Sequence, residues 1–136
     1  MKQIPTIALC VMFWCGPVFA ADWVVLRHDN EAGFVLYLDK SSVVKKGVNI
    51  YALFLFNFQS IRTTDDEYKR PYRSIADYNY VNCKDETIAS AGQDIFSKEM
   101  GNGKVVNSFR VKEKDLFFSD YSTENGMAKY RSVCAK

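Results

Sequence analysis

The chain has 136 residues, a formal net charge of +2 and a hydrophobic content of 48%. This length allows for one small domain once a short leader is set aside. The nearly balanced charge gives no concentrated positive surface, so it provides no argument for a nucleic acid partner.

The amino-terminal segment has the pattern of a secretory signal peptide. Lys2 precedes an apolar run at 4–19, and the small residues Val18 and Ala20 lie three positions and one position before the predicted cleavage point. A membrane anchor is the alternative, but the run is short for a spanning helix and two prolines interrupt it. We therefore predict cleavage after Ala20 and export of a mature domain at 21–136.

The cysteines indicate one disulfide and no lipid anchor. Cys10 and Cys15 follow Leu9 and Trp14, whereas a lipid-modified cysteine needs a small residue before it. An exported domain that keeps two cysteines most simply forms one disulfide, here between Cys83 and Cys134. Loss of Lys2 with the leader leaves 17 basic residues against 16 acidic ones, so the mature domain is nearly neutral.

Runs of aromatic and β-branched residues between turn signals predict a series of strands. We expect them at 23–26, 34–38, 48–58, 74–83, 87–97 and 104–111, with a short last one at 116–118. The run at 48–58 is apolar on both sides near its middle, which favours a central strand over a buried helix. The polar segment at 59–73, which contains Pro71, is predicted to be a long loop.

The pattern changes to that of a helix after Ser122 or Thr123, either of which can cap the first turn. An apolar face is expected from residues at helical spacing, namely Met127, Tyr130, Val133 and Cys134. Gly126 weakens such a helix by about 1 kcal/mol relative to alanine. The predicted fold class is therefore α+β, an antiparallel sheet of five or six strands with one carboxy-terminal helix, tied by a disulfide.

No local pattern predicts a catalytic, metal or cofactor site. His28 is the only histidine, falls in a predicted turn and has no ligand cluster beside it. Gly101-Asn102-Gly103-Lys104 lacks the glycine spacing and the hydroxyl residue of a phosphate loop, so it predicts a hairpin turn. Asp65-Asp66-Glu67 lacks the spacing of a calcium loop. A catalytic group assembled only in space stays open as a third hypothesis.

The predicted long loop carries the one candidate interaction site. Tyrosine and arginine are the residue types that dominate binding hot spots, although a plain solvated loop is the alternative. The candidate partner-binding residues are Tyr68, Lys69, Arg70, Tyr72 and Arg73.

Several short motifs, in order, resemble the surface-adhesin protein E family of exported Gram-negative domains. They run from Trp23 through Tyr37-Leu38-Asp39, Val48-Asn49-Ile50-Tyr51, Tyr72-Arg73-Ser74-Ile75, Asn82-Cys83 and Met100-Gly101-Asn102-Gly103-Lys104 to Ser132-Val133-Cys134. Tyr51, Asn82 and Phe117 or Phe118 depart from the residues that the family usually has there. The resemblance implies an antiparallel sheet, a carboxy-terminal helix and a Cys83–Cys134 disulfide.

The resemblance also implies surface exposure and binding to host extracellular proteins. The leading hypothesis is accordingly a non-catalytic, adhesin-like domain without a cofactor that recognises a protein partner such as a host matrix protein. The alternative is a periplasmic inhibitor of an enzyme such as lysozyme. Its location, periplasm or cell surface, and its oligomeric state, monomer or homodimer, stay open.

Overall fold

The computed structural model describes residues 21–134. The predicted leader, its cleavage after Ala20 and the two leader cysteines, Cys10 and Cys15, lie outside the described residues. Within the described part, no helix is long and apolar enough to cross a membrane.

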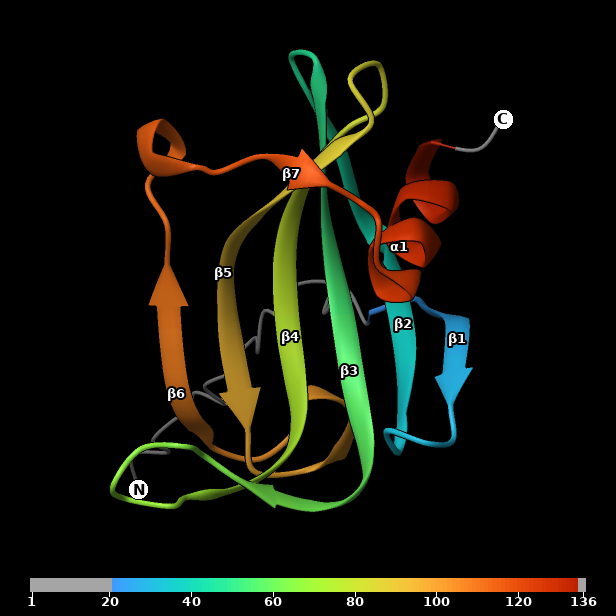
Figure 1. The fold of residues 1–136 in the computed structure, drawn as a ribbon. Coiled ribbons are helices and arrows are strands. Elements are labelled where there is room, and N and C mark those ends of the chain that lie inside the picture. Colours follow the sequence, from blue (N-terminus) through green and yellow to red (C-terminus); the bar gives the residue numbers. More distant parts are fainter. Residues whose placement is uncertain (1–20, 135–136) are drawn as a thin grey trace, which may run out of the picture.

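The fold is a curled antiparallel sheet with one helix, as the sequence predicted (Figure 1). Six long strands pair in chain order: β1 (Trp23–Asp29), β2 (Phe34–Lys46), β3 (Asn49–Thr63), β4 (Pro71–Asn82), β5 (Thr87–Phe96) and β6 (Val105–Arg110). A seventh strand, β7 (Ser119–Asp120), pairs with β5. Two short 3-10 turns, η1 (Glu99–Gly101) and η2 (Glu113–Asp115), flank β6, and α1 (Glu124–Cys134) follows β7.

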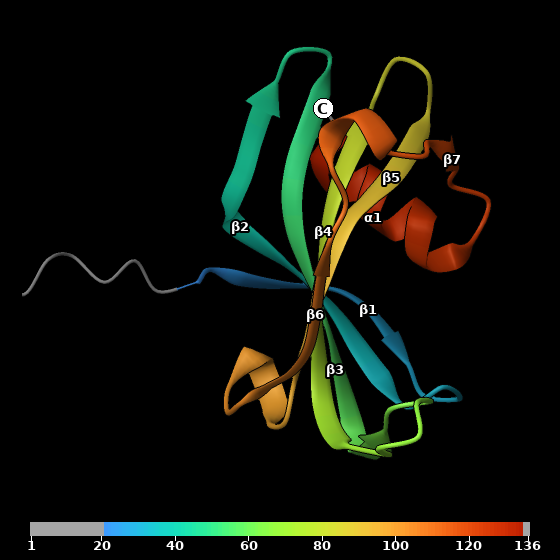
Figure 2. The same cartoon turned by 90° about the vertical axis from the view of Figure 1, so that its left-hand side faces the viewer.

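The two faces of the sheet are covered differently. Figure 2 shows α1 and β7 on one side, here called the inner face, and the turn at η1 on the other, the outer face. The core lies on the inner face, where alternate residues of β2 and β3 are buried: Phe34, Leu36, Leu38, Ala52, Phe54 and Phe58. Alternation follows from the two-residue period of a strand. Ala128 and Val133 of α1 pack against this cluster.

The strand β3 is central and apolar on both faces, as predicted. Phe54 on the inner face and Leu55 on the outer face are both 0% exposed. On the outer face η1 covers this end of the sheet, because the Ser74 hydroxyl donates to the Lys98 carbonyl at 2.6 Å and accepts from the Gly101 amide at 2.9 Å. Both faces of β3 are therefore buried by different elements.

Three predicted boundaries are wrong because polar residues continue the strands. The predicted loop at 59–73 is only 64–70, since β3 runs to Thr63 and β4 begins at Pro71. The polar break after Leu38 is an irregularity inside β2, where pairing shifts between Asp39 and Val44. Asp39 stabilises it by accepting from the Ser41 amide at 3.0 Å and the Ser41 hydroxyl at 2.6 Å.

Two smaller predictions also need correction. His28 lies in β1, paired with Val35, and not in a turn. The last strand is Ser119–Asp120 and not 116–118. The predicted cap of α1 is confirmed, and of the two candidates it is Thr123, whose hydroxyl accepts from the Gly126 amide at 3.0 Å.

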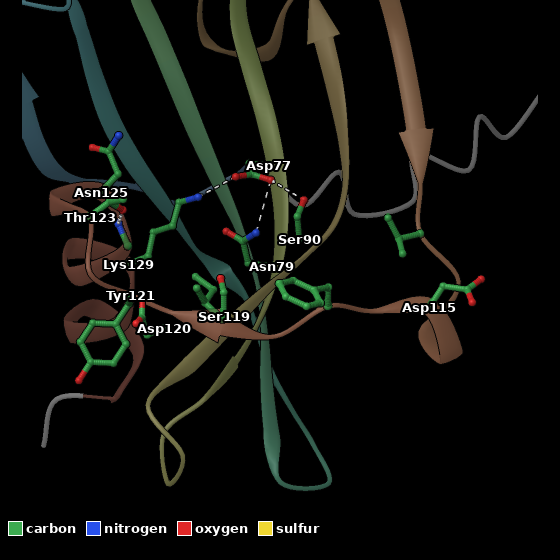
Figure 3. Close-up of a pocket in the computed structure, with 14 residues that line it drawn as sticks. Asp77, Asn79, Ser90, Asp115, Ser119, Asp120, Tyr121, Thr123, Asn125 and Lys129 are labelled. Carbon is green, nitrogen blue, oxygen red and sulfur yellow. Dashed lines mark hydrogen bonds and ion pairs between the residues drawn. The ribbon is translucent and has the colours of Figure 1, made fainter.

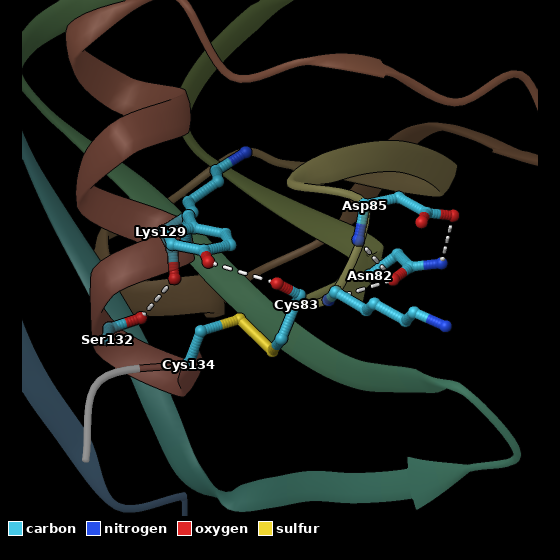
Figure 4. Close-up of a disulfide and its surroundings, with 8 residues drawn as sticks. Asn82, Cys83, Asp85, Lys129, Ser132 and Cys134 are labelled. Carbon is cyan, nitrogen blue, oxygen red and sulfur yellow. Dashed lines mark hydrogen bonds between the residues drawn. A yellow bond between two sulfur atoms is a disulfide. The ribbon is translucent and has the colours of Figure 1, made fainter.

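The disulfide joins the last residue of α1 to the residue after β4 (Figure 4). Cys83 and Cys134 have a Cα–Cα distance of 5.6 Å, which confirms the predicted pair. Beside it, the Tyr130 hydroxyl donates to the Cys83 carbonyl at 3.1 Å, and the Tyr130 ring stacks on Tyr121 at 4.2 Å. The covalent bond and the hydrogen bond hold α1 against the end of β4, and the stacked rings hold it against the segment between β7 and α1.

Candidate functional site

The loop at 64–70 is a compact turn at one end of the sheet. The Thr64 amide donates to the Arg70 carbonyl at 2.9 Å, and the Arg70 amide donates back to the Thr64 hydroxyl at 3.0 Å. Asp66 accepts from the Thr64 hydroxyl at 2.7 Å and from the Tyr68 amide at 3.2 Å. The hydrogen bonds from Thr64 and Arg70 lower the pKa of the Asp66 carboxyl below its ordinary value.

The five predicted site residues separate into two groups. Tyr68 and Lys69 are exposed at the tip of the loop, Tyr68 by 71%, and the Arg70 guanidinium lies 5.6 Å from the centre of the Tyr68 ring. Tyr72 instead packs on Phe58, with ring centres 5.7 Å apart, as part of the inner-face core. The tip therefore presents one aromatic side chain.

Arg73 lies in β4, beside a second exposed feature. Its guanidinium donates to the Phe58 and Gln59 carbonyls and pairs with Glu99 at 2.5 Å. It lines a pocket of about 460 Å³ together with Ile61, which is 66% exposed. We call the set Ile61, Tyr68, Lys69, Arg70 and Arg73 the loop-end surface.

Positive charge on the loop-end surface is balanced by nearby carboxylates. Arg70 pairs with Asp66 at 3.0 Å, and Arg73 pairs with Glu99. Lys69 is accompanied by the exposed carboxylates of Asp65 and Glu67. The three positive charges are thus neutralised locally, and the surface has no strong field to attract a charged partner from a distance.

A second candidate site is a polar pocket beneath α1 that no sequence pattern indicated. It has a volume of about 490 Å³ and lies between α1, β7 and the inner-face side of β4 and β5. In its wall the Lys129 ammonium donates to the Asp77 carboxylate at 2.6 Å, and both side chains are less than 10% exposed. Figure 3 shows Asn79 and Ser90 beside this pair. We call it the helix-side pocket.

Further hydrogen bonds and an aromatic ring stabilise the buried ion pair of the helix-side pocket. Asp77 accepts from the Ser90 hydroxyl at 3.3 Å and from the Asn79 amide nitrogen at 3.4 Å. The Lys129 ammonium also lies 5.2 Å from the centre of the Phe54 ring. The position of Lys129 in the sequence of α1 did not predict its burial, because a lysine between two apolar residues is normally interpreted as solvent-exposed. The helix thus buries Lys129, which the predicted apolar face did not include.

A third group lies on the outer face, where Arg110 of β6 forms a bidentate pair with Asp94 of β5. The two nitrogen–oxygen distances are 2.9 and 2.8 Å, and the Tyr78 hydroxyl donates to the same carboxylate at 2.9 Å. The Arg110 hydrogen bonds lower the pKa of Asp94 to about 2. Burial, followed by the bond to Asp94, raises the pKa of Tyr78 to about 12.

Two observations concern metal ligands and thiols in the described residues. No group of three or more potential metal ligands occurs between residues 21 and 134. Both cysteines of this part are oxidised, so neither supplies a thiol nucleophile.

A known protein family matches almost the whole described chain. The sequence profile of the Surface-adhesin protein E family matches residues 23–135. The chain belongs to the surface-adhesin protein E family. It is therefore an adhesin-like protein of the cell surface, and the family points to a non-enzymatic role in binding a protein partner. No curated protein matches the sequence.

Solved structures of protein E from Haemophilus influenzae share the fold. Crystal form II has 17% sequence identity, a TM-score of 0.57, and a match over 85% of this chain and 97% of that one. Protein E from a non-typeable strain has 17% identity, a TM-score of 0.54, and covers 86% of this chain and 85% of that one. At this identity the likeness shows the fold alone.

Proposed function

We propose that the protein is a non-catalytic binding domain that recognises a host extracellular or envelope protein through its loop-end surface. Family membership supports the class of function. The observation that carries the site is Tyr68, which is 71% exposed on a loop whose backbone is held by its own hydrogen bonds. A loop ordered before binding loses little conformational entropy when a partner arrives.

Tyr68 has the features of an interface anchor. An aromatic side chain with a polar tip gives a large contact area at the cost of few rotatable bonds. The Arg70 guanidinium beside the ring is itself paired with Asp66, which restricts its rotation. The pocket between Ile61 and Arg73 gives the partner a second point of contact.

The predicted leader places this domain outside the cytoplasm. In the proposal, cleavage after Ala20 releases the mature domain without a lipid anchor, because Leu9 and Trp14 precede the leader cysteines. Tyr68 is then available to proteins of the envelope or of the host. Protease access from outside intact cells distinguishes the cell surface from the periplasm.

The test uses a variant that removes the anchor but keeps the loop. Tyr68→Ala leaves Thr64, Asp66 and Arg70 in place, so the backbone hydrogen bonds of the loop remain. Val48→Ala is the matched control, because Val48 is 77% exposed in the turn between β2 and β3, at the other end of β3. Both exposed substitutions should change the unfolding free energy by less than about 0.5 kcal/mol.

Binding is measured against immobilised host matrix proteins and, separately, as inhibition of a muramidase. For a bound matrix protein, Tyr68→Ala should weaken binding by about tenfold or more while Val48→Ala does not. Full binding by folded Tyr68→Ala would move the site away from the loop-end surface. Inhibition of the muramidase that is lost in Tyr68→Ala would assign the inhibitor role instead.

A further inference from the structure

The end of the sheet that lies opposite the loop at 64–70 is built from two turns. Figures 1 and 2 show the turn between β2 and β3 at the same end as the turn between β4 and β5, with the loop at the other end of β3. Lys45 pairs with Ile50 and Ile50 pairs with Val81, so three strands reach this end in register. The disulfide at Cys83 fixes the second turn to α1.

Apolar side chains are exposed at the tip of this end. Val48 is 77% exposed in the turn between β2 and β3, and Val43 and Val44 are exposed in the last part of β2. Val43 and Val48 also line, together with Ile50, a mostly apolar pocket of about 490 Å³ that extends to the turn after β4. Single exposed valines are normal on a protein surface, whereas several on one hairpin mark an interaction site.

Lysines lie beside these valines. Lys45 and Lys84 are exposed and line the same pocket, one from each of the two hairpins. Lys46 extends over the outer face, with its ammonium 4.8 Å from the centre of the Tyr51 ring. Between residues 21 and 134, none of the three lysines forms an ion pair with a carboxylate. We call the set Val43, Val44, Lys45, Lys46, Val48 and Lys84 the hairpin-end surface.

Two acidic residues of the turn between β4 and β5 lie on the neighbouring side. Asp85 and Glu86 line a different pocket, which they share with Asp120 and Tyr121. Asp85 also accepts from the Asn82 side-chain amide at 3.1 Å. Positive charge and apolar side chains therefore coincide on the hairpin-end surface, which complements a partner that is both anionic and apolar.

An anionic phospholipid membrane has both properties. Valine side chains at the tip of a hairpin enter the region of the headgroups, while lysine side chains beside them keep their ammonium groups at the level of the phosphates. Each lysine near an anionic membrane strengthens binding by about fivefold. A soluble polyanion would contact the lysines and gain nothing from the exposed valines, so the membrane accounts for more of the observations.

We propose that the hairpin-end surface docks on an anionic phospholipid membrane, with Val48 among the headgroups and the three lysines at the phosphates. The mature domain, for which no acyl chain is predicted, would thereby attach reversibly to an envelope membrane. The loop-end surface lies at the other end of β3, so it would face away from the membrane. The two surfaces share no residue, and each proposal can fail without the other.

Vesicle co-sedimentation tests the docking. The mature domain should bind vesicles of phosphatidylglycerol and phosphatidylcholine and should not bind vesicles of phosphatidylcholine alone. Higher salt should weaken the binding, because it screens the lysine charges. Absence of binding to the anionic vesicles, or equal binding to both, would overturn the proposal.

Charge removal shows whether the attraction is local. Lys45→Gln with Lys84→Gln should weaken binding to the anionic vesicles by about tenfold to thirtyfold. The control, Lys98→Gln with Lys104→Gln, makes the same change in net charge at two exposed lysines beside η1, at the other end of β5. It should leave the affinity within about twofold, because distant charges are screened. Equal weakening by the two double variants would overturn the site.

The apolar part of the surface is tested by Val48→Asn. This variant should weaken binding by about threefold to tenfold, because it removes the gain from taking an apolar side chain out of water. Val105→Asn, at another exposed valine, is the control and should bind like the native protein. All these side chains are exposed, so each variant should stay folded, which thermal unfolding checks. Binding that depends on the lysines but not on Val48 would overturn the membrane and assign the surface to a soluble polyanion.

Tryptophan fluorescence tests the orientation. Val48→Trp should be quenched by brominated lipids in the anionic vesicles, whereas Tyr68→Trp on the loop-end surface should not. Trp23, the only native tryptophan after the predicted leader, gives the same background in both variants. Quenching of Tyr68→Trp in place of Val48→Trp would overturn the hairpin-end site. Val48→Ala remains a control for matrix-protein binding, because that assay contains no lipid.

Discussion

Lys129 of α1 and Asp77 of β4 form an ion pair at 2.6 Å, although 52 positions separate them in the chain. Their side chains are 8% and 9% exposed, so the charges are almost fully removed from water. Each charge compensates the burial of the other, and the rings of Phe54 and Phe56 lie beside the ammonium at 5.2 and 5.1 Å. The position of α1 on the inner face therefore depends on this pair as well as on the disulfide.

Removal of one member of this pair should be costly. Lys129→Met leaves the Asp77 carboxylate buried without its countercharge, and the unfolding free energy should fall by about 3–5 kcal/mol. The double variant Lys129→Met with Asp77→Leu removes both charges and should recover most of this loss. Urea unfolding measures all three proteins. A double variant that is no more stable than Lys129→Met would show that the pair contributes little through charge.

The disulfide should matter most for α1. Cys134→Ser opens a loop with a sequence separation of 51, which the chain-entropy estimate values at about 4 kcal/mol. A short helix that contains Gly126 has little stability of its own, so α1 should lose hydrogen-exchange protection before the six long strands. Cys83→Ser is the matched control and should behave alike. Equal loss of protection throughout the chain would contradict this order.

Acid should weaken the protein through Asp94. Its pKa is lowered from the ordinary value of 3.8 to about 2, so it binds a proton more readily in the unfolded chain. Its contribution to stability is therefore complete above pH 3.8 and is lost as the pH falls toward 2. Urea unfolding between these values should show a shallower pH dependence in Asp94→Asn than in the native protein. Parallel curves would contradict the lowered pKa.

High pH should also lower the stability of the protein, through deprotonation of Tyr78. Its pKa is raised from 10.0 to about 12, so the unfolded chain loses this proton first. The contribution of the Tyr78 hydroxyl to stability is complete below pH 10 and is lost as the pH rises toward 12. Burial also raises the pKa of Tyr51 and of Tyr121. Ultraviolet titration should therefore show several late tyrosines that titrate normally in urea, and Tyr78→Phe should reduce their number by one.

Gly92 should tolerate no side chain. It has a φ of +145°, and a β-carbon there would lie 2.4 Å from the Phe109 carbonyl oxygen of β6. Gly92→Ala should therefore disrupt the pairing of β6 with β5. Gly47→Ala is the control, because Gly47 has a φ of +60° in open space and should cost only about 1 kcal/mol. Hydrogen exchange of the β6 amides should be faster in Gly92→Ala and unchanged in Gly47→Ala. Native protection of β6 in Gly92→Ala would contradict the prediction.

The leader prediction is checked by intact mass. The exported protein should begin at Ala21 and contain only Cys83 and Cys134, joined to each other. A mass that includes the leader or an acyl chain would refute cleavage after Ala20 or the absence of an anchor.

The sequence predicted the sheet because aromatic and β-branched runs, which are local patterns, indicated each long strand. It predicted the disulfide because only two cysteines lie after the predicted leader. Strand ends were less predictable, since Gln59 and Ser60 are exposed and lie where the pairing of β3 with β4 is irregular, between Asn57 and Arg62. A polar sequence of this kind cannot be distinguished from a loop. The loop at 64–70 is half the expected length for this reason.

The sites were harder to predict than the strands. Tyr72 and Arg73 belong to β4, and their surroundings are made by Phe58 and Glu99, which are distant in the chain. Lys129 and Asp77 are typical surface residues in composition, and only the three-dimensional fold shows that they are buried together. The one sequence feature that could have indicated the burial of Lys129 is its position in a helix in which about half of the residues are apolar.

The pairing of each long strand with its neighbour in sequence has a consequence for how the protein folds. Each hairpin closes over a short connection, so contacts form early at low entropic cost. The helix is the exception, because α1 must contact β1 and β2 after β3 to β6 have intervened. We expect refolding in two kinetic steps, first the sheet and then the docking of α1, with an oxidant controlling the rate of the second.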